Sequence, residues 1–190
     1  MKKFLFILLI PFSLFASTLE TQLVEIENTY QNTNTLQAEF VQSTYVPLLE
    51  KTITRPGRIF YEKGGKLRIE YAANPMTHYI SDGTTLWILQ PQTKKTETIE
   101  LKNSGLPDEA LRFLTELGNL RTYFKVAASG DGFKLTPKNR SIYKFLVGTF
   151  GENHYLKTLV IHNKTGNESK YYFTNLKTGM PLSEKLFIGY

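Results

Sequence analysis

The chain has 190 residues, with 23 Lys and Arg against 17 Asp and Glu, and it has no cysteine. This length can enclose one hydrophobic core, and a modest positive charge without a basic cluster excludes a nucleic-acid-binding surface. Without cysteine the chain can form neither a disulfide framework nor the lipid-modified cysteine of a lipoprotein. We therefore expect a protein that is soluble after processing.

The N-terminal segment has the pattern of a secretory signal peptide. Two lysines precede an unbroken apolar run, Phe4 to Ile10, and small residues follow at Ala16. The run is short and a proline interrupts it, which disfavours the alternative of an uncleaved membrane anchor. We expect cleavage after Ala16, so that residues 1–16 are the signal peptide and residues 17–190 form a single domain.

The segment 18–35 has the spacing of an amphipathic helix. Apolar side chains recur on one side of the predicted helix, and glutamates occupy other positions. The predicted buried face consists of Leu19, Leu23, Ile26 and Tyr30, and the glutamates expected to face elsewhere are Glu20, Glu25 and Glu27.

A second helix is predicted for residues 107–118, because Pro107 and Asp108 suit a helix start and Gly118 suits a helix end. Its apolar positions are Ala110, Leu111, Leu114 and Leu117. A shorter helix within 119–125 has no capping residues to support it.

The rest of the chain alternates with the period of two that is typical of strands. Leu36, Ala38 and Phe40 begin the pattern, and hairpin turns are predicted at Gly64-Gly65 and Asp82-Gly83. About ten short strands without interleaved helices indicate a mainly β protein. We expect a single antiparallel sheet, strongly curved or partly closed, and two helices available to cover it.

No pattern indicates catalysis. The three histidines, His78, His154 and His162, have no second histidine or carboxylate at metal-ligand spacing, and no G-x-S-x-G elbow is present. Asp82 and Asp131 suit turns. We therefore expect no enzyme activity, no metal and no cofactor.

The strand "TLWILQ", which follows the Asp82-Gly83 turn, is apolar on both faces. Several strands in the first half of the chain share this property. The second apolar face is either ordinary core or the wall of an apolar cavity under a helical lid.

Three segments resemble the LolA family of periplasmic outer-membrane lipoprotein carriers: "LQAEFVQS" at 36–43, "KLRIEYAANP" at 66–75 and "HYISDGTTLWILQPQTKKTE" at 78–97. "FKLTPK" at 133–138 also looks like a family segment. The resemblance implies an unclosed antiparallel β-barrel, capped by α-helices, that encloses an apolar cavity. It also implies a soluble periplasmic chaperone that shields the acyl chains of lipoproteins on the way from the inner to the outer membrane.

The implied partners are acylated lipoproteins, an inner-membrane ABC transporter complex (LolCDE-like) that loads the carrier, and an outer-membrane receptor (LolB-like) that unloads it. We expect a monomer. The alternatives are a relative of the same fold that binds another amphiphile such as a glycolipid, a lipid-sensing partner of a regulator, and a secreted hydrolase.

On this basis we expect side chains of the sheet to form the cavity wall and side chains of the helices to form the lid. The wall candidates are Phe40, Phe60, Leu67, Ile69, Trp87 and Leu89, and the lid candidates are Leu23, Ile26, Tyr30, Leu111, Leu114 and Lys63. Lys63 stands where the family has an arginine thought to hold the lid. Lysine lacks the planar five-donor fork of arginine, so we expect a less directional contact.

Overall fold

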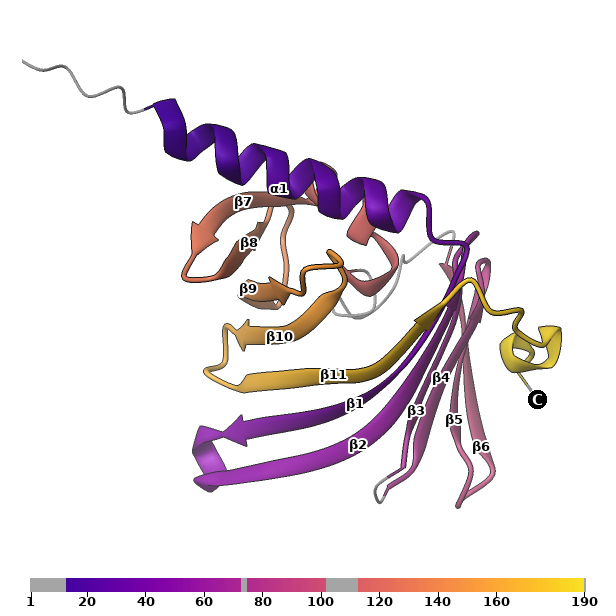
Figure 1. The fold of residues 1–190 in the computed structure, drawn as a ribbon. Coiled ribbons are helices and arrows are strands. Elements are labelled where there is room, and N and C mark those ends of the chain that lie inside the picture. Colours follow the sequence, from indigo (N-terminus) through magenta and orange to yellow (C-terminus); the bar gives the residue numbers. More distant parts are fainter. Residues whose placement is uncertain (1–12, 73–74, 102–112, 190) are drawn as a thin grey trace, which may run out of the picture.

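The computed structural model describes residues 13–72, 75–101 and 113–189. A long helix, α1 (Ser13–Gln31), lies across one side of a large curved sheet (Figure 1). The strands are β1 (Thr35–Val46), β2 (Lys51–Glu62), β3 (Lys66–Tyr71), β4 (Thr77–Asp82), β5 (Thr85–Gln90), β6 (Lys95–Glu100), β7 (Phe124–Ser129), β8 (Gly132–Pro137), β9 (Tyr143–Phe150), β10 (Leu156–Asn163) and β11 (Glu168–Thr178).

The described strands form one 11-stranded sheet in the order β6-β5-β4-β3-β2-β1-β11-β10-β9-β8-β7. Neighbouring strands are antiparallel, and the outermost strands β6 and β7 do not pair with each other. The sheet is therefore curved but not closed into a barrel. This confirms the predicted fold class.

The hairpin turns use the predicted residues. Gly64 and Gly65 have φ of 102° and 87°, and Gly83 has φ of 96°, which are left-handed values that favour glycine. The carboxylate of Asp82 accepts hydrogen bonds from the backbone nitrogens of Thr84 and Thr85, each at 2.8 Å. Asp82 is therefore a turn residue, as the sequence predicted.

One face of the sheet, called the inner face here, carries the main core. Along β1 every second residue from Leu36 to Phe40 is buried, and β3 repeats this pattern. These side chains belong to one apolar cluster with Leu23 and Ile26 of α1, which are each 2 % exposed. The helix therefore covers the inner face, as its spacing predicted.

The helices differ from the prediction in their bounds. α1 begins at Ser13, before the predicted cleavage position, and ends at Gln31. Of the second predicted helix, residues 113–118 are described, and Phe113–Thr115 is helical. A 3-10 turn, η2 (Leu117–Asn119), and the short helix α4 (Leu120–Tyr123) follow. Among the described helices, none is long and apolar enough to span a bilayer.

Candidate functional site

Three of the six wall candidates lie on the inner face. Phe40, Leu67 and Ile69 are buried to 4 %, 1 % and 4 % exposure within the main core. Gly57 makes room for Phe40, because a side chain at Gly57 would collide with the Phe40 ring. Tyr71 and Phe40 form an edge-to-face pair with ring centroids 5.3 Å apart.

The other three wall candidates lie on the opposite face, which we call the outer face, so their prediction as wall residues was wrong. The register pairs Phe60 with Arg68, Arg68 with Ile80, and Ile80 with Trp87. Paired residues share a face, and the inner residues Ile59 and Ile69 occupy the alternate positions. Leu89 lies two residues from Trp87 and therefore also points outward.

The C-terminal segment covers Trp87 on the outer face. The 3-10 turn η3 (Glu184–Phe187) buries Phe187 to 2 % exposure, and Gly189 lies against the Trp87 indole. A guanidinium nitrogen of Arg68 donates to the carbonyl of Leu186 at 3.1 Å, which holds the segment on the sheet. On the outer face of β5, the indole of Trp87 thus packs against the protein's own C-terminal segment.

Between the inner face and the helices lies a small apolar cavity of about 30 Å³. It is lined by Tyr30, Leu36, Ala38, Ile59, Tyr61, Leu114, Leu117, Leu156, Phe173 and Leu176. This volume holds about one water molecule. Ligand pockets for small molecules typically measure about 300–1,000 Å³. The cavity is therefore apolar, as the family resemblance implied, but it is much smaller than a ligand pocket.

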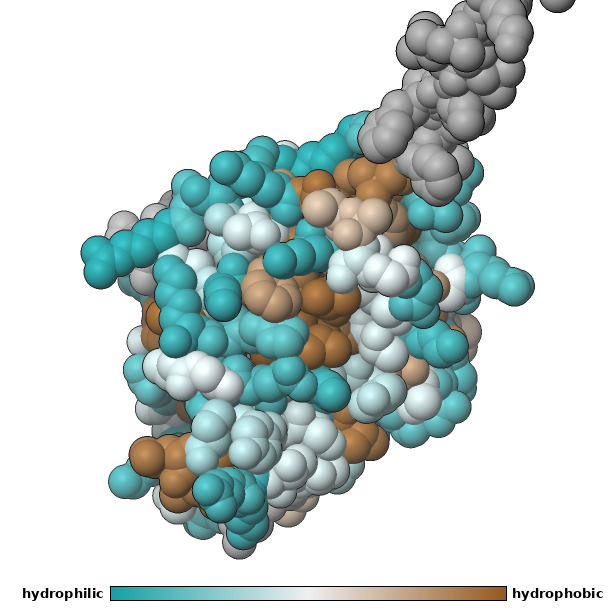
Figure 2. All heavy atoms as spheres, turned by 90° about the vertical axis from the view of Figure 1, so that its left-hand side faces the viewer, coloured by the Kyte–Doolittle hydropathy of each residue, from teal (hydrophilic) through white to brown (hydrophobic). Residues whose placement is uncertain are grey.

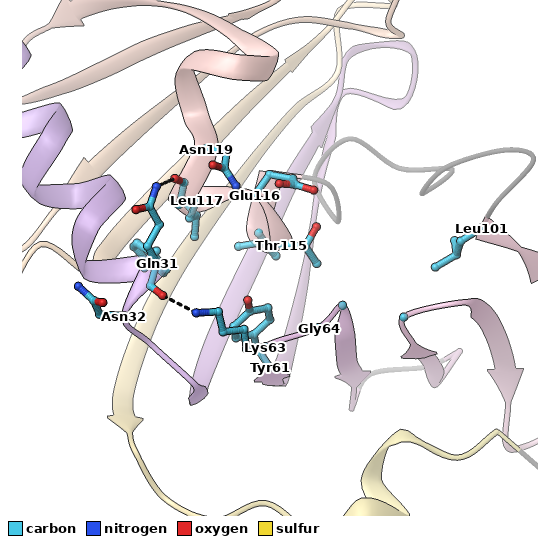
Figure 3. Close-up of a pocket in the computed structure, with 15 residues that line it drawn as sticks. Gln31, Asn32, Tyr61, Lys63, Gly64, Leu101, Thr115, Glu116, Leu117 and Asn119 are labelled. Atoms are coloured by element: carbon cyan, nitrogen blue, oxygen red, sulfur yellow. Dashed lines mark hydrogen bonds between the residues drawn. The ribbon is translucent and has the colours of Figure 1, made fainter.

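A larger pocket of about 710 Å³ opens directly outside this cavity. It is bounded by the end of α1, the β2–β3 and β4–β5 turns, and the segment Leu114–Asn119 (Figure 3). Four side chains line both spaces: Tyr30, Tyr61, Leu114 and Leu117. These four residues separate the surface pocket from the apolar interior.

The lid candidates on α1 face the sheet. Leu23, Ile26 and Tyr30 are buried against the inner face, and Leu114 packs partly buried against the same cluster. Leu111 lies outside the described residues. The Tyr30 hydroxyl accepts a hydrogen bond from the backbone nitrogen of Leu156 at 2.9 Å. Burial raises the pKa of Tyr30 above its ordinary range, so its hydroxyl stays neutral.

Lys63 contacts the lid directly. Its Nζ donates to the backbone carbonyl of Gln31, the last residue of α1, at 2.8 Å (Figure 3). The Gln31 side chain in turn donates from Nε2 to the carbonyl of Gly118 at 2.7 Å. A cation at a helix C-terminus also interacts favourably with the helix dipole. We call these two bonds the Lys63–Gln31–Gly118 latch.

The sequence missed another connection, which joins α1 to α4. Glu27 was expected to face away from the core, but it is only 5 % exposed, and its carboxylate pairs with the Arg121 guanidinium. The backbone nitrogen of Arg121 donates to the same carboxylate at 3.0 Å. Glu20 and Glu25 are exposed, as predicted. The local sequence around Glu27 does not indicate this ion pair, because Arg121 lies 94 residues later in the chain.

The four residues between the two spaces are chemically suited to exclude water. Tyr61 is half-buried, and burial, together with the nearby charge of Glu116, raises its pKa. Both tyrosines therefore present neutral rings. The interior can accept apolar groups and offers no ionised side chain among the described residues that line it.

Comparisons with known proteins agree with this architecture. A family model described as outer membrane lipoprotein carrier protein LolA matches residues 31–188. An outer-membrane lipoprotein carrier protein of Methylococcus capsulatus is 27 % identical over 184 residues, which cover 91 % of this chain and 86 % of that protein.

Two solved structures share the fold at low sequence identity. A LolA superfamily protein of Nitrosomonas europaea aligns with a TM-score of 0.51 at 11 % identity, covering 90 % of this chain and 97 % of that one. A DUF1329 family protein of Desulfovibrio piger aligns with a TM-score of 0.51 at 12 % identity. The alignment covers 89 % of this chain and 96 % of that one. Because the family model spans most of the sequence, the chain belongs to the LolA family of outer membrane lipoprotein carrier proteins.

Proposed function

We propose that this protein carries lipoproteins from the inner to the outer membrane, with their acyl chains held between the inner face and the lid. The observation that supports this most directly is the apolar cavity of about 30 Å³ between the inner face and the helices. The described lining is apolar except for two tyrosines, and this matches a ligand without charge along its length.

The energetics require the lid to move. Burying one methylene group stabilises by roughly 0.8 kcal/mol, so a long acyl chain is stabilised by about 10 kcal/mol. Such a chain cannot fit into the closed cavity. Opening exposes Leu114 and Leu117, and binding then covers the same wall with the acyl chain. Apolar contacts are exchanged for others of similar size, so uptake and release can both occur.

The proposal includes the cellular context. We infer that residues 1–16 direct export, that residues 17–190 act in the periplasm as one carrier domain, and that the protein is a non-enzymatic monomer. A LolCDE-like transporter would load it, and a LolB-like receptor would receive the cargo. The carrier relatives and the signal-peptide pattern at the N-terminus support this context.

A reversible disulfide across the lid tests the proposal. A Cβ placed at Gly118 lies 3.6 Å from the Cα of Gln31, so cysteines at both positions are within disulfide reach. The chain has no other cysteine, which makes Gln31→Cys/Gly118→Cys a clean pair. The assay is release of a triacylated lipoprotein from spheroplasts into solution.

We expect the natural protein to release the lipoprotein, the oxidised variant to release none, and the same sample to recover after reduction. Folded natural protein that releases nothing would contradict the carrier function. Equal release by oxidised and reduced variants would contradict entry under the lid. Glycolipid instead of lipoprotein in the purified protein would favour the alternative of another amphiphile.

A further inference from the structure

The three most exposed large apolar side chains among the described residues lie on turns. Leu48 and Leu49 are 93 % and 64 % exposed, and both belong to the 3-10 turn η1 (Pro47–Leu49) that joins β1 to β2. Ile142 is 58 % exposed and directly precedes β9. Side chains exposed to this degree contribute little to the core, and adjacent ones can mark an interaction site.

These turns adjoin one another. The ring of Pro47 lies 3.8 Å from a Cβ placed at Gly166, in the turn between β10 and β11. In that same turn, the backbone nitrogen of Lys164 donates to the carbonyl of Ile142 at 3.0 Å. The turns therefore lie next to one another and form a rim, defined here by Leu48, Leu49, Lys51, Ile142 and Lys164.

The rim lies on the side of the sheet that is at the left in Figure 1, where the β1–β2 hairpin extends away from α1. Figure 2 looks onto this side and shows separate apolar areas among polar atoms. The surface pocket of about 710 Å³ lies at the opposite end of β1 and β2, beside the end of α1 and the β2–β3 turn. The rim is thus distinct from the lid and its pocket.

We propose that this rim is a contact surface for a lipid bilayer that contains anionic lipids. The two leucines stand at the tip of the β1–β2 hairpin and are exposed to solvent. A stable protein interface usually buries about 1,200–2,000 Å² of complementary surface. A bilayer, in contrast, accepts individual apolar side chains that protrude from a turn.

The flanking residues are those found at a membrane interface. Lys51 and Lys164 are exposed beside the leucines, and lysines near a membrane surface are attracted to anionic headgroups. Tyr45 is 45 % exposed on the same hairpin, and tyrosine is enriched at the level of the headgroups. Glu50 is the acidic residue of the hairpin tip, so it and the two lysines together carry a net charge of +1.

Such a contact is weak and reversible, because few apolar groups enter the bilayer. It would hold the protein briefly at a membrane surface, independently of what the cavity contains. The proposal does not rest on the carrier function, since membrane contact can be measured with protein free of cargo.

The experiment is flotation with vesicles of phosphatidylethanolamine and phosphatidylglycerol, compared with vesicles of phosphatidylcholine alone. The protein is purified after export, with its N-terminus established by mass spectrometry. We expect the natural protein to float with the anionic vesicles. Leu48→Ser/Leu49→Ser should lower the partition coefficient at least about tenfold. Met180→Ser is the control, because Met180 is 52 % exposed but lies beyond the opposite end of β11.

A second variant tests the charge. Lys51→Gln/Lys164→Gln should remove the preference for anionic vesicles, and added salt should do the same to the natural protein. The proposal is wrong if the natural protein does not float with either vesicle type, or if the leucine variant floats equally well. If there is no flotation but the leucine variant loses lipoprotein release, the rim binds a protein partner and the membrane proposal is overturned.

Discussion

Nε of Arg121 lies 2.8 Å from Oε2 of Glu27, and Nη2 of the same guanidinium lies 2.5 Å from that oxygen. The side chain of Glu27 is 6 % exposed, whereas that of Arg121 is 46 % exposed. The pair joins α1 to α4 across two segments that are far apart in the sequence. It therefore fixes the position of the lid helix without touching the apolar cavity.

Arg121→Ala should destabilise the protein by about 2 kcal/mol, because it leaves the buried Glu27 carboxylate without its charged partner. Removing one partner of a fully buried ion pair costs about 3–5 kcal/mol. We expect a smaller loss here, because water reaches Arg121. Urea denaturation measures it. Glu20→Gln is the matched control, because exposed Glu20 also pairs with Arg121 but should contribute less than about 0.5 kcal/mol. Equal effects of the two substitutions would contradict the importance of burial.

Lys63→Met should weaken the latch and open the lid more often. It removes one hydrogen bond and the cation at the end of α1, an interaction worth about 0.3–1 kcal/mol. We expect hydrogen exchange at the last turn of α1 to become a few times faster, and uptake of a fluorescent fatty acid to speed up.

Two controls accompany this variant. Lys157→Met removes an exposed lysine on β10 and should leave both rates unchanged. Lys63→Arg restores the planar fork typical of the family and should slow exchange. If hydrogen exchange at the last turn of α1 is as slow in Lys63→Met as in the natural protein, Lys63 does not hold the lid.

The sequence predicted the sheet, the hairpins and the lid helix because each follows from local periodicity and turn chemistry. The prediction of wall residues on β2 and β5 was wrong, because assigning a side chain to a face of the sheet also requires the pairing register of the strands. Glu62 pairs with Lys66 around the turn, which places Phe60 opposite Arg68. Counting outward from the Gly64-Gly65 turn would have placed Phe60 on the charged face.

Other parts of the site depend on contacts that local patterns do not encode. The pairing of Glu27 with Arg121 spans 94 residues, and no periodicity links the two positions. The C-terminal residues Leu186 and Phe187 gave no sign that they pack on the outer face, because a partner such as Arg68 lies 118 residues before Leu186. The size of the cavity depends on how closely the lid packs, and this too lies beyond a sequence pattern.

Phe187→Ala should destabilise the protein by about 3 kcal/mol, because it removes a ring that is 2 % exposed. It should also shift Trp87 emission to longer wavelength as water reaches the indole. Ile188→Ala is the control, since Ile188 is the next residue and is 52 % exposed. Denaturation followed by Trp87 fluorescence gives both readouts. An unchanged emission maximum in Phe187→Ala would show that the C-terminal segment does not shield Trp87.

Trp87 should not report on the proposed cargo. Because its indole lies on the outer face, an acyl chain with a quencher should leave its emission unchanged. Moving the fluorophore to the lining, in Trp87→Phe/Tyr61→Trp, should give strong quenching by the same chain. The comparison is a titration of both proteins with a brominated fatty acid. Quenching of Trp87 but not of the tryptophan at position 61 would place the binding site on the outer face.

Stability should fall in acid partly through Asp82. Burial raises the pKa of this carboxyl, but hydrogen bonds from Thr85 and Thr84 outweigh it and hold the pKa below its ordinary value of 3.8. A carboxyl with a lowered pKa in the folded state stabilises the protein above its ordinary pKa. That stabilisation is lost as the pH falls from 3.8 through the lowered value.

Asp82→Asn should therefore lower stability at neutral pH and flatten the acid side of the stability curve. Denaturation midpoints measured from neutral pH to below 3.8 test this. Asp131→Asn, in the β7–β8 turn, controls for the loss of one carboxylate elsewhere on the sheet. If the two variants have the same pH profile, the hydrogen bonds at the Asp82-Gly83 turn do not favour the ionised carboxylate. The turn before "TLWILQ" would then be held by glycine conformation alone.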